Sequence, residues 1–143
     1  MKINLTIPIP TSYHKCRVED LMKTLTKHRD LIFQDLVARK DHPTAKMVFE
    51  SVKGKADRIS FATVYNSLEY LVEHGLINKL NIESESIRYD AFLENHSHLI
   101  CRNCGKVFDV PSLNLKTEDV HFDELGFQVD RIDISILGRC LNC

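Results

Sequence analysis

The sequence predicts an α+β protein in which a winged helix-turn-helix domain precedes a small α/β domain with a zinc knuckle. Three observations indicate this architecture. Apolar residues recur at helical spacing in the first half, two strand-like segments follow the last helix, and two C-x-x-C pairs stand 35 residues apart in the second half. A chain of 143 residues accommodates two small domains and excludes a long multi-domain enzyme.

Four helices are expected before residue 75, because each stretch carries apolar residues along one helical stripe. The stripes are Val18, Leu21, Met22 and Leu25; Leu31, Ile32, Leu36 and Val37; Ala45, Val48, Phe49 and Val52; and Val64, Leu68, Leu71 and Val72. Ser60 suits the N-cap of the fourth helix, and Gly75 suits the position just beyond its end.

A β-hairpin is expected after the fourth helix. Residues 76–82 and 87–91 have the composition of strands and flank the polar turn Glu83-Ser84-Glu85-Ser86. Helices followed by a hairpin suggest a winged helix-turn-helix, in which the helix before the hairpin, residues 61–74 here, faces the DNA major groove. The pattern alone leaves a generic small helical domain as the alternative.

The second half predicts a separate α+β domain. Strands are expected at residues 98–101, 106–110 and 127–137, and a helix is expected at residues 117–125. We place the winged-helix domain at residues 1–84, a hinge at 85–94 and a metal-binding domain at 95–143.

Composition and charge restrict the class of protein. With 43% hydrophobic and 27% charged residues, wholesale disorder is excluded. No apolar run approaches the ~20 residues of a membrane span, and the N-terminus lacks the features of a secretory signal, so we expect a cytoplasmic protein without a membrane partner. Residues 1–82 contain 13 Lys and Arg against 9 Asp and Glu, whereas residues 83–143 contain 6 against 11. A basic first half is suited to bind a polyanion, and an acidic second half is suited to bind cations, although chance alone can produce such a difference in charge.

The paired cysteines indicate a structural zinc site. Cys101 and Cys104 form one C-x-x-C turn, and Cys140 and Cys143 form the other. Two such turns complete the tetrahedral sulfur shell that zinc prefers. Two disulfides are the competing interpretation, which a reducing cytosol disfavours. Cys16 has no partner in this pattern and is expected in the core of the first helix.

A second group of residues suggests a different metal site. His96 and His98 lie two positions apart, so on an extended segment both imidazoles project to the same face. Asp90 precedes the pair, and Asp109 follows at the end of the next strand. Nitrogen and oxygen ligands without sulfur suit iron(II), manganese(II) or zinc. Solvated histidines beside a zinc site are the alternative.

Together these segments make the sequence resemble the ferric uptake regulator family of metal-dependent bacterial repressors, over nearly the whole chain. Within the family it looks most like the peroxide-sensing repressors. The segments that carry the resemblance are His42-Pro43-Thr44-Ala45, Ala62-Thr63-Val64-Tyr65-Asn66, Arg88-Tyr89-Asp90, His96-Ser97-His98-Leu99-Ile100-Cys101-Arg102-Asn103-Cys104-Gly105-Lys106 and Cys140-Leu141-Asn142-Cys143. Each segment is weak evidence alone, but their order and spacing together are specific.

The resemblance implies a DNA-binding winged helix, a C-terminal dimerisation domain and a homodimer that binds a palindromic operator in double-stranded DNA. It assigns the four paired cysteines to structural zinc. It also implies a regulatory iron(II) or manganese(II) site between the domains, with five ligands: His42, Asp90, His96, His98 and Asp109. The residues implied to contact DNA are Ser60, Thr63, Tyr65 and Asn66.

The resemblance to peroxide-sensing members depends on Asp109, because iron-uptake repressors usually have Glu at that position. In the peroxide sensors, bound iron(II) reacts with hydrogen peroxide and oxidises ligand histidines, so that metal and DNA are released. The matching positions are His42 and His96. Two departures stand out: the segment 24–29 is shorter than usual, and Ser97 and Ile132 replace the ligands of a further metal site, which we therefore do not expect.

Three other functions are the alternatives to this interpretation. An iron- or zinc-uptake regulator that binds its metal reversibly is the alternative within the same family. A zinc hydrolase or deaminase fails on chemistry, because four cysteines close the coordination shell and the H-x-E motif of deaminases is missing. A zinc-ribbon module without DNA binding conflicts with the recognition-helix string at residues 62–66.

Overall fold

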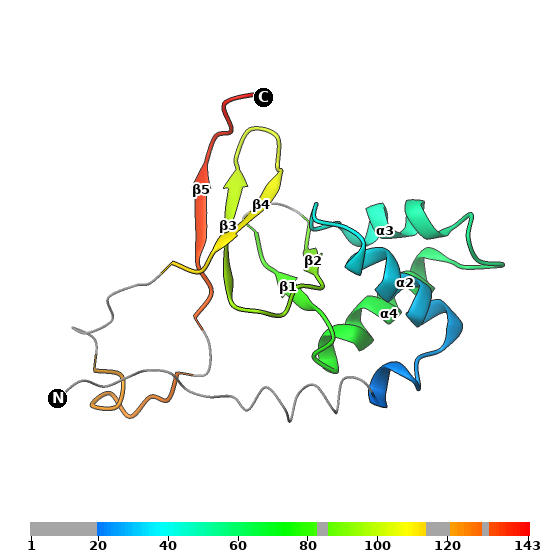
Figure 1. The fold of residues 1–143 in the computed structure, drawn as a ribbon, viewed down its shortest axis with the longest axis horizontal. Helices are drawn as coiled ribbons and strands as arrows, with labels where there is room; N and C mark the ends of the chain where they lie inside the picture. Colours follow the sequence, from blue (N-terminus) through cyan, green and yellow to red (C-terminus); the bar gives the residue numbers. More distant parts are fainter. Residues whose placement is uncertain (1–19, 83–85, 114–120, 130–131) are drawn as a thin grey trace.

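A computed structural model of the chain describes residues 20–82, 86–113, 121–129 and 132–143. Helices occupy the first part, and a two-stranded and a three-stranded sheet follow. In Figure 1 the two-stranded sheet lies between the helices and the three-stranded sheet. Within the described ranges, no helix is long and apolar enough to cross a membrane.

Each helix of the first part begins at a hydroxyl side chain that caps its amino end. The helices are α2 (Lys27–Val37), α3 (Ala45–Val52) and α4 (Phe61–Glu73), and their caps are Thr26, Thr44 and Ser60. Each hydroxyl oxygen accepts a hydrogen bond from the backbone N–H three residues later, which satisfies a donor that the first turn leaves free. These three helices lie where the sequence predicted them. Of the expected first helix, residues 20–22 are helical, and the residues before them, including Cys16, lie outside the described part.

The apolar stripes of the three helices meet in one core. Burying an aliphatic side chain of this size contributes about 1.5–3 kcal/mol. The stripes therefore account for the mutual packing of the helices. The helical side chains that are 0% exposed are Ile32, Val48, Val52, Val64, Leu68 and Leu71.

The wing is a short hairpin bound to α4. In it β1 (Asn78–Leu80) pairs antiparallel with β2 (Arg88–Asp90). The Tyr89 hydroxyl donates to Glu69 Oε1 in α4 at 3.1 Å, and Lys79 Nζ lies 3.0 Å from each carboxylate oxygen of Glu69. The helices and this hairpin form the predicted winged helix, although both strands are shorter than expected.

The second sheet has the order β4-β3-β5. The central strand β3 (His96–Cys101) pairs antiparallel with β4 (Val107–Pro111) and parallel with β5 (Ser135–Gly138). The register places His98 opposite Asp109. The strand pairing therefore brings a histidine of one strand against a carboxylate of the next.

Two expectations for this domain need correction. The helix expected at residues 117–125 is not formed in its described part, where residues 122–126 make turns; residues 117–120 lie outside the described chain. Of the strand expected at 127–137, residues 127–129 and 132–134 form no strand, β5 supplies residues 135–137, and residues 130–131 lie outside the described chain. Ser135 pairs with His98, and β3 begins only two residues earlier, so β3 ends before it could pair with residue 132.

Leu68→Ala is expected to lower the free energy of unfolding by about 2–5 kcal/mol, because it opens a cavity in the centre of the core. Val37→Ala is the matched control: Val37 lies in α2 but is 54% exposed, and its replacement should change stability by less than about 1 kcal/mol. Urea denaturation followed by circular dichroism gives both values. Equal losses in the two variants would contradict the core described here.

Candidate metal centres

The two C-x-x-C pairs meet at one end of the three-stranded sheet. Cys101 ends β3 and Cys104 lies in the following turn, whereas Cys140 and Cys143 follow β5. The Sγ–Sγ distance is 3.5 Å between Cys101 and Cys143 and 3.7 Å between Cys104 and Cys140. All four sulfurs lie within 4.8 Å of one another, and all four are free thiols rather than disulfides. Figure 1 shows the C-terminal end beside the turn that joins β3 to β4.

The sulfur cluster fits a zinc ion. A tetrahedron with Zn–S bonds of about 2.3 Å has edges of about 3.8 Å, close to the Sγ–Sγ distances above. Hydrogen bonds from the backbone N–H groups of Cys140 and Cys104 lower the pKa of Cys101 to about 5. In contrast, the neighbouring Cys143 sulfur, burial and the other two sulfurs raise the pKa of Cys140 to about 12, because a second negative charge there is disfavoured. A dication would remove this repulsion.

A second cluster forms where the helical part approaches the three-stranded sheet. Four of its side chains each offer one ligand atom, and these atoms lie within 4.8 Å of one another: His42, His96, His98 and Asp109. Asp90 at the end of β2 joins them, because its carboxylate oxygens lie 3.2–4.0 Å from Nε2 of each histidine. The cluster therefore contains residues from the α2–α3 connection, from the wing and from strands β3 and β4.

Asp109 lies against all three imidazoles. Its Oδ1 atom is 2.8 Å from Nε2 of His42, 3.3 Å from Nε2 of His96 and 3.7 Å from Nε2 of His98. The Asp109 side chain is 33% exposed, whereas the other four residues of the cluster are buried. One side of the cluster is therefore open to solvent.

Several buried atoms of this cluster have no hydrogen-bond partner among the residues that the structure describes. The Nε2 atoms of His42, His96 and His98 and Oδ2 of Asp90 are buried without a hydrogen bond. Such atoms are rare in folded proteins, since each unsatisfied polar group costs about 1–3 kcal/mol. Their common orientation fits a cation at their centre, and the nitrogen and oxygen donor set fits manganese(II), iron(II) or zinc.

Neighbouring groups orient the ligand atoms. The His96 Nδ1 atom lies 2.7 Å from the Glu94 carbonyl oxygen. Because a carbonyl can only accept, the proton of the neutral ring is on Nδ1, and Nε2 presents its lone pair to the cluster. The Phe92 backbone N–H likewise donates to Asp90 Oδ1 at 2.8 Å.

The protonation states also suit metal binding. Burial lowers the pKa of His42 despite the nearby Asp109 and Asp90 carboxylates, which favours the neutral ring that a metal requires. Burial alone would raise the pKa of Asp90. The His98 side chain, the Phe92 N–H and the other histidines outweigh that effect and hold the pKa of Asp90 below its usual value.

A cavity of about 420 Å³ opens on the exposed side of this cluster. Its lining includes His42, Asp90, Asp109 and Phe92. The cavity is large enough for small molecules, so the cluster is accessible from solvent without unfolding.

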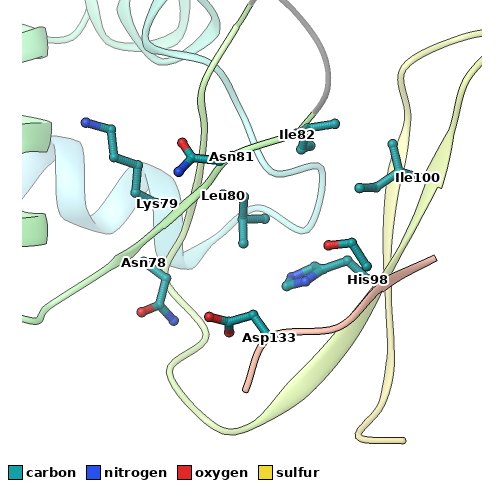
Figure 2. Close-up of a pocket in the computed structure, with 9 residues that line it drawn as sticks. Asn78, Lys79, Leu80, Asn81, Ile82, His98, Ile100 and Asp133 are labelled. Atoms are coloured by element: carbon teal, nitrogen blue, oxygen red, sulfur yellow. The ribbon is translucent and has the colours of Figure 1, made fainter. Parts of the chain in front are cut away.

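A further cavity of about 310 Å³ lies between the wing and the three-stranded sheet. Figure 2 shows Asn78 and Leu80 on the wing side and His98 and Asp133 on the sheet side. His98 therefore borders a space between the two sheets as well as the cluster.

Helix α4 exposes several of the predicted DNA-contacting residues. Tyr65 is 41% exposed, and Asn66 is also exposed. Ser60 Oγ accepts from the Thr63 backbone N–H and lies 2.9 Å from Thr63 Oγ1, so these hydroxyls contact each other at the start of the helix. All four residues thus belong to the amino-terminal half of α4 or its cap.

All five residues expected at the regulatory site come together in the structure, and so do the four cysteines. Sequence reasoning missed two groups that support the site, the Glu94 carbonyl and the Arg88 guanidinium. Arg88 donates to the carbonyl oxygen of His42 at 3.2 Å. The position of Arg88 two residues before Asp90 was the available signal, but it indicated no contact with His42.

Cys101→Ser is expected to release one zinc ion per chain and to unfold the protein or dissociate its dimer, because the binding free energy of such a site is also folding free energy. Asn142→Ser changes the other C-x-x-C turn but keeps all four thiols, so it should retain zinc. Elemental analysis and size-exclusion chromatography measure the two effects. Retention of zinc by a compact Cys101→Ser dimer would refute the structural zinc site.

Comparison with known proteins agrees with this architecture. The model of the ferric uptake regulator family matches residues 22–137. Among solved structures, the ferric uptake regulator of Francisella tularensis with iron superposes with a TM-score of 0.70 at 24% identity, covering 84% of this chain and 93% of that one. At this identity the likeness shows the fold.

Relatives with higher identity are peroxide-responsive regulators. The chain is 36% identical over 121 residues to the peroxide operon regulator of Bacillus subtilis, covering 83% of both chains. It is 32% identical over 121 residues to the peroxide-responsive repressor PerR of Staphylococcus epidermidis, covering 83% of this chain and 80% of the relative. The chain therefore belongs to the ferric uptake regulator family and is a transcription regulator, not an enzyme.

Proposed function

We propose that this chain is a homodimeric, metal-dependent repressor that binds a palindromic operator and releases it when hydrogen peroxide oxidises a ligand histidine. The observation that carries the proposal is the cluster of three histidines and two aspartates, in which buried, inward-facing atoms have no hydrogen-bond partner among the described residues. The names of the Bacillus and Staphylococcus relatives support the response to peroxide.

The proposed division of the chain explains how metal could control DNA binding. Residues 1–84 would read DNA, residues 85–94 would act as the hinge, and residues 95–143 would dimerise. His42 belongs to the first part and Asp90 to the hinge, whereas His96, His98 and Asp109 belong to the third. A cation bound by all five residues would favour one angle between the two recognition helices of a dimer, and its loss would release that angle.

The exposed surface of the second domain supports a homodimer. Large apolar side chains that are at least 37% exposed recur there, and a second copy of the chain would cover such surface. Those in the second domain are Leu99, Phe108, Leu113, Leu125, Phe127, Ile132, Ile136 and Leu141. The zinc held by the four cysteines would join β5 to β3 in the same domain.

DNA recognition is assigned to the amino-terminal half of α4. Ser60, Thr63, Tyr65 and Asn66 would contact bases or phosphates in the major groove. The excess of Lys and Arg in residues 1–82 favours approach to DNA. We place this activity in the cytoplasm.

The chemistry of the switch follows from the rings in the cluster. Iron(II) bound there would supply the electrons that activate hydrogen peroxide beside the imidazoles. The overall change inserts one oxygen atom of the peroxide into a C–H bond of the ring and releases water. The carbonyl group so formed makes the ring a poorer ligand. His42 and His96 are the proposed targets, and both lie within 3.3 Å of Asp109 Oδ1.

Tyr65→Ala is expected to weaken specific operator binding by about 5- to 150-fold while leaving fold, dimer and both metals unchanged, because the exposed ring contributes little to the core. Loss of one good base contact costs about 1–3 kcal/mol. Fluorescence anisotropy on a site selected with the manganese-loaded wild-type protein measures the effect. Glu73→Gln at the far end of α4 is the control. If the Tyr65→Ala protein binds the operator with unaltered affinity, the DNA-binding surface lies elsewhere on the molecule.

Iron-loaded protein exposed to low hydrogen peroxide is expected to gain one oxygen atom on His42 or His96 and to lose DNA binding. Manganese-loaded protein should do neither, because manganese(II) does not support the reaction. Mass spectrometry of tryptic peptides locates the added oxygen. If neither histidine is oxidised at peroxide levels that leave methionines intact, reversible metal sensing by an iron- or zinc-uptake regulator becomes the better description.

Asp109→Glu is expected to separate metal binding from oxidation. The longer side chain keeps the carboxylate but displaces the metal by a fraction of the ~1.5 Å carbon–carbon step. Manganese-dependent DNA binding should persist while histidine oxidation is blunted. Oxidation at the wild-type rate would show that the length of this ligand does not control the reaction.

A further inference from the structure

Arg88 contacts two parts of the chain that are far apart in sequence, the segment from His42 to Met47 and the turn at Gly105. Its Nη1 atom donates to the His42 carbonyl oxygen at 3.2 Å and lies 3.7 Å from Met47 Sδ in α3. Its Nη2 atom donates to the Gly105 carbonyl oxygen at 3.0 Å. Gly105 directly follows Cys104, so one guanidinium bridges the residue that carries a candidate metal ligand and the turn that carries two of the zinc-binding thiols.

The backbone of His42 needs such support. Its φ angle is 48°, in the left-handed region that non-glycine residues rarely adopt. Pro43 follows it, and a residue before proline is driven toward extended conformations instead. A conformation of this kind costs about 1–3 kcal/mol and persists only when its surroundings hold it.

Strand β2 holds this segment at two adjacent carbonyls. Arg88 donates to the His42 carbonyl, and the Tyr89 backbone N–H donates to the Pro43 carbonyl at 3.0 Å. With these two carbonyls held, the Cα–Cβ bond of His42 is directed into the cluster, where its Nε2 atom lies 2.8 Å from Asp109 Oδ1. The hydrogen bond to the His42 carbonyl comes from the Arg88 side chain, so a substitution at residue 88 can remove it.

We infer that Arg88 is a positioning residue for the regulatory metal: by bridging the His42 and Gly105 carbonyls, it holds His42 ready to bind metal and connects that ligand to the zinc-binding turn. The inference rests on the proposed regulatory site. Arginine suits this task because its planar fork reaches two acceptors at once, whereas the single ammonium of lysine cannot replace both hydrogen bonds in the same geometry.

The test is a cobalt(II) titration of zinc-loaded protein, because cobalt reports both affinity and ligand set through its absorption spectrum. Arg88→Met is expected to weaken binding by about 10- to 100-fold, the range found when a residue supporting a metal ligand is removed. The spectrum of bound cobalt should shift toward that of the His42→Ala protein. Arg88→Lys should weaken binding less, as a partial rescue.

A double-mutant cycle distinguishes positioning from general destabilisation. In the His42→Ala background, Arg88→Met should cause no further loss of cobalt affinity, because the ligand it positions is absent. Lys79→Met is the matched control. It removes a cation of the same hairpin that pairs with Glu69 and not with the cluster, so the cobalt spectrum should stay unchanged. Zinc content and thermal unfolding are measured for every variant.

The outcomes separate the two proposals. If wild-type protein binds no cobalt beyond its zinc, the regulatory site itself is refuted. If wild-type protein binds cobalt and Arg88→Met binds it with the same affinity and spectrum, the positioning role is overturned. An equal loss in the wild-type and His42→Ala backgrounds also overturns it. If Arg88→Met does not fold, Arg88→Lys decides, because unchanged affinity and spectrum in that variant contradict the inference.

Discussion

The burial of unpartnered metal-binding atoms is the constraint on which the arrangement of the two halves depends. His42, Asp90, His96 and His98 are each at most 9% exposed, yet their inward-facing atoms have no hydrogen bond within the described ranges of the chain. Leaving these groups unsatisfied is costly, and a shared cation offsets the cost. Because the donors come from both halves of the chain, binding of one cation by all of them would couple the metal affinity to the relative orientation of the two halves.

The same strand that contributes Asp90 is attached to the recognition helix. Tyr89 is 1% exposed and donates to Glu69 of α4, and burial together with Glu69 raises the pKa of Tyr89, which keeps its hydroxyl protonated as a donor. Lys79 completes the network through its ion pair with Glu69. These contacts join the wing to α4, so under the proposed function a displacement of β2 at the metal cluster would be transmitted to the surface proposed to contact DNA.

Local sequence patterns predicted most helices and the sulfur site. The features that they did not predict depend on contacts between residues that are distant in sequence. The helices follow from apolar spacing and from caps such as Ser60, and the sulfur site follows from paired cysteines. His42 was found only through family resemblance, because its place beside His96 and His98 depends on tertiary packing. Arg88 was missed because its hydrogen-bond acceptors are backbone carbonyls, which every residue has. The last strand was predicted too long because its length is set by where β3 begins.

The uneven exposure of the histidine and aspartate cluster has a kinetic consequence. Asp109 is the ligand-bearing side chain that faces solvent, at 33% exposure, and it borders the cavity of about 420 Å³. If the cluster binds a cation as proposed, an ion entering through that cavity would meet Asp109 first and would lose most of its water shell before it reached the buried imidazoles. An ion leaving the site would pass Asp109 last. Exchange through this carboxylate would then change the residence time of the metal without an equal change in its equilibrium affinity.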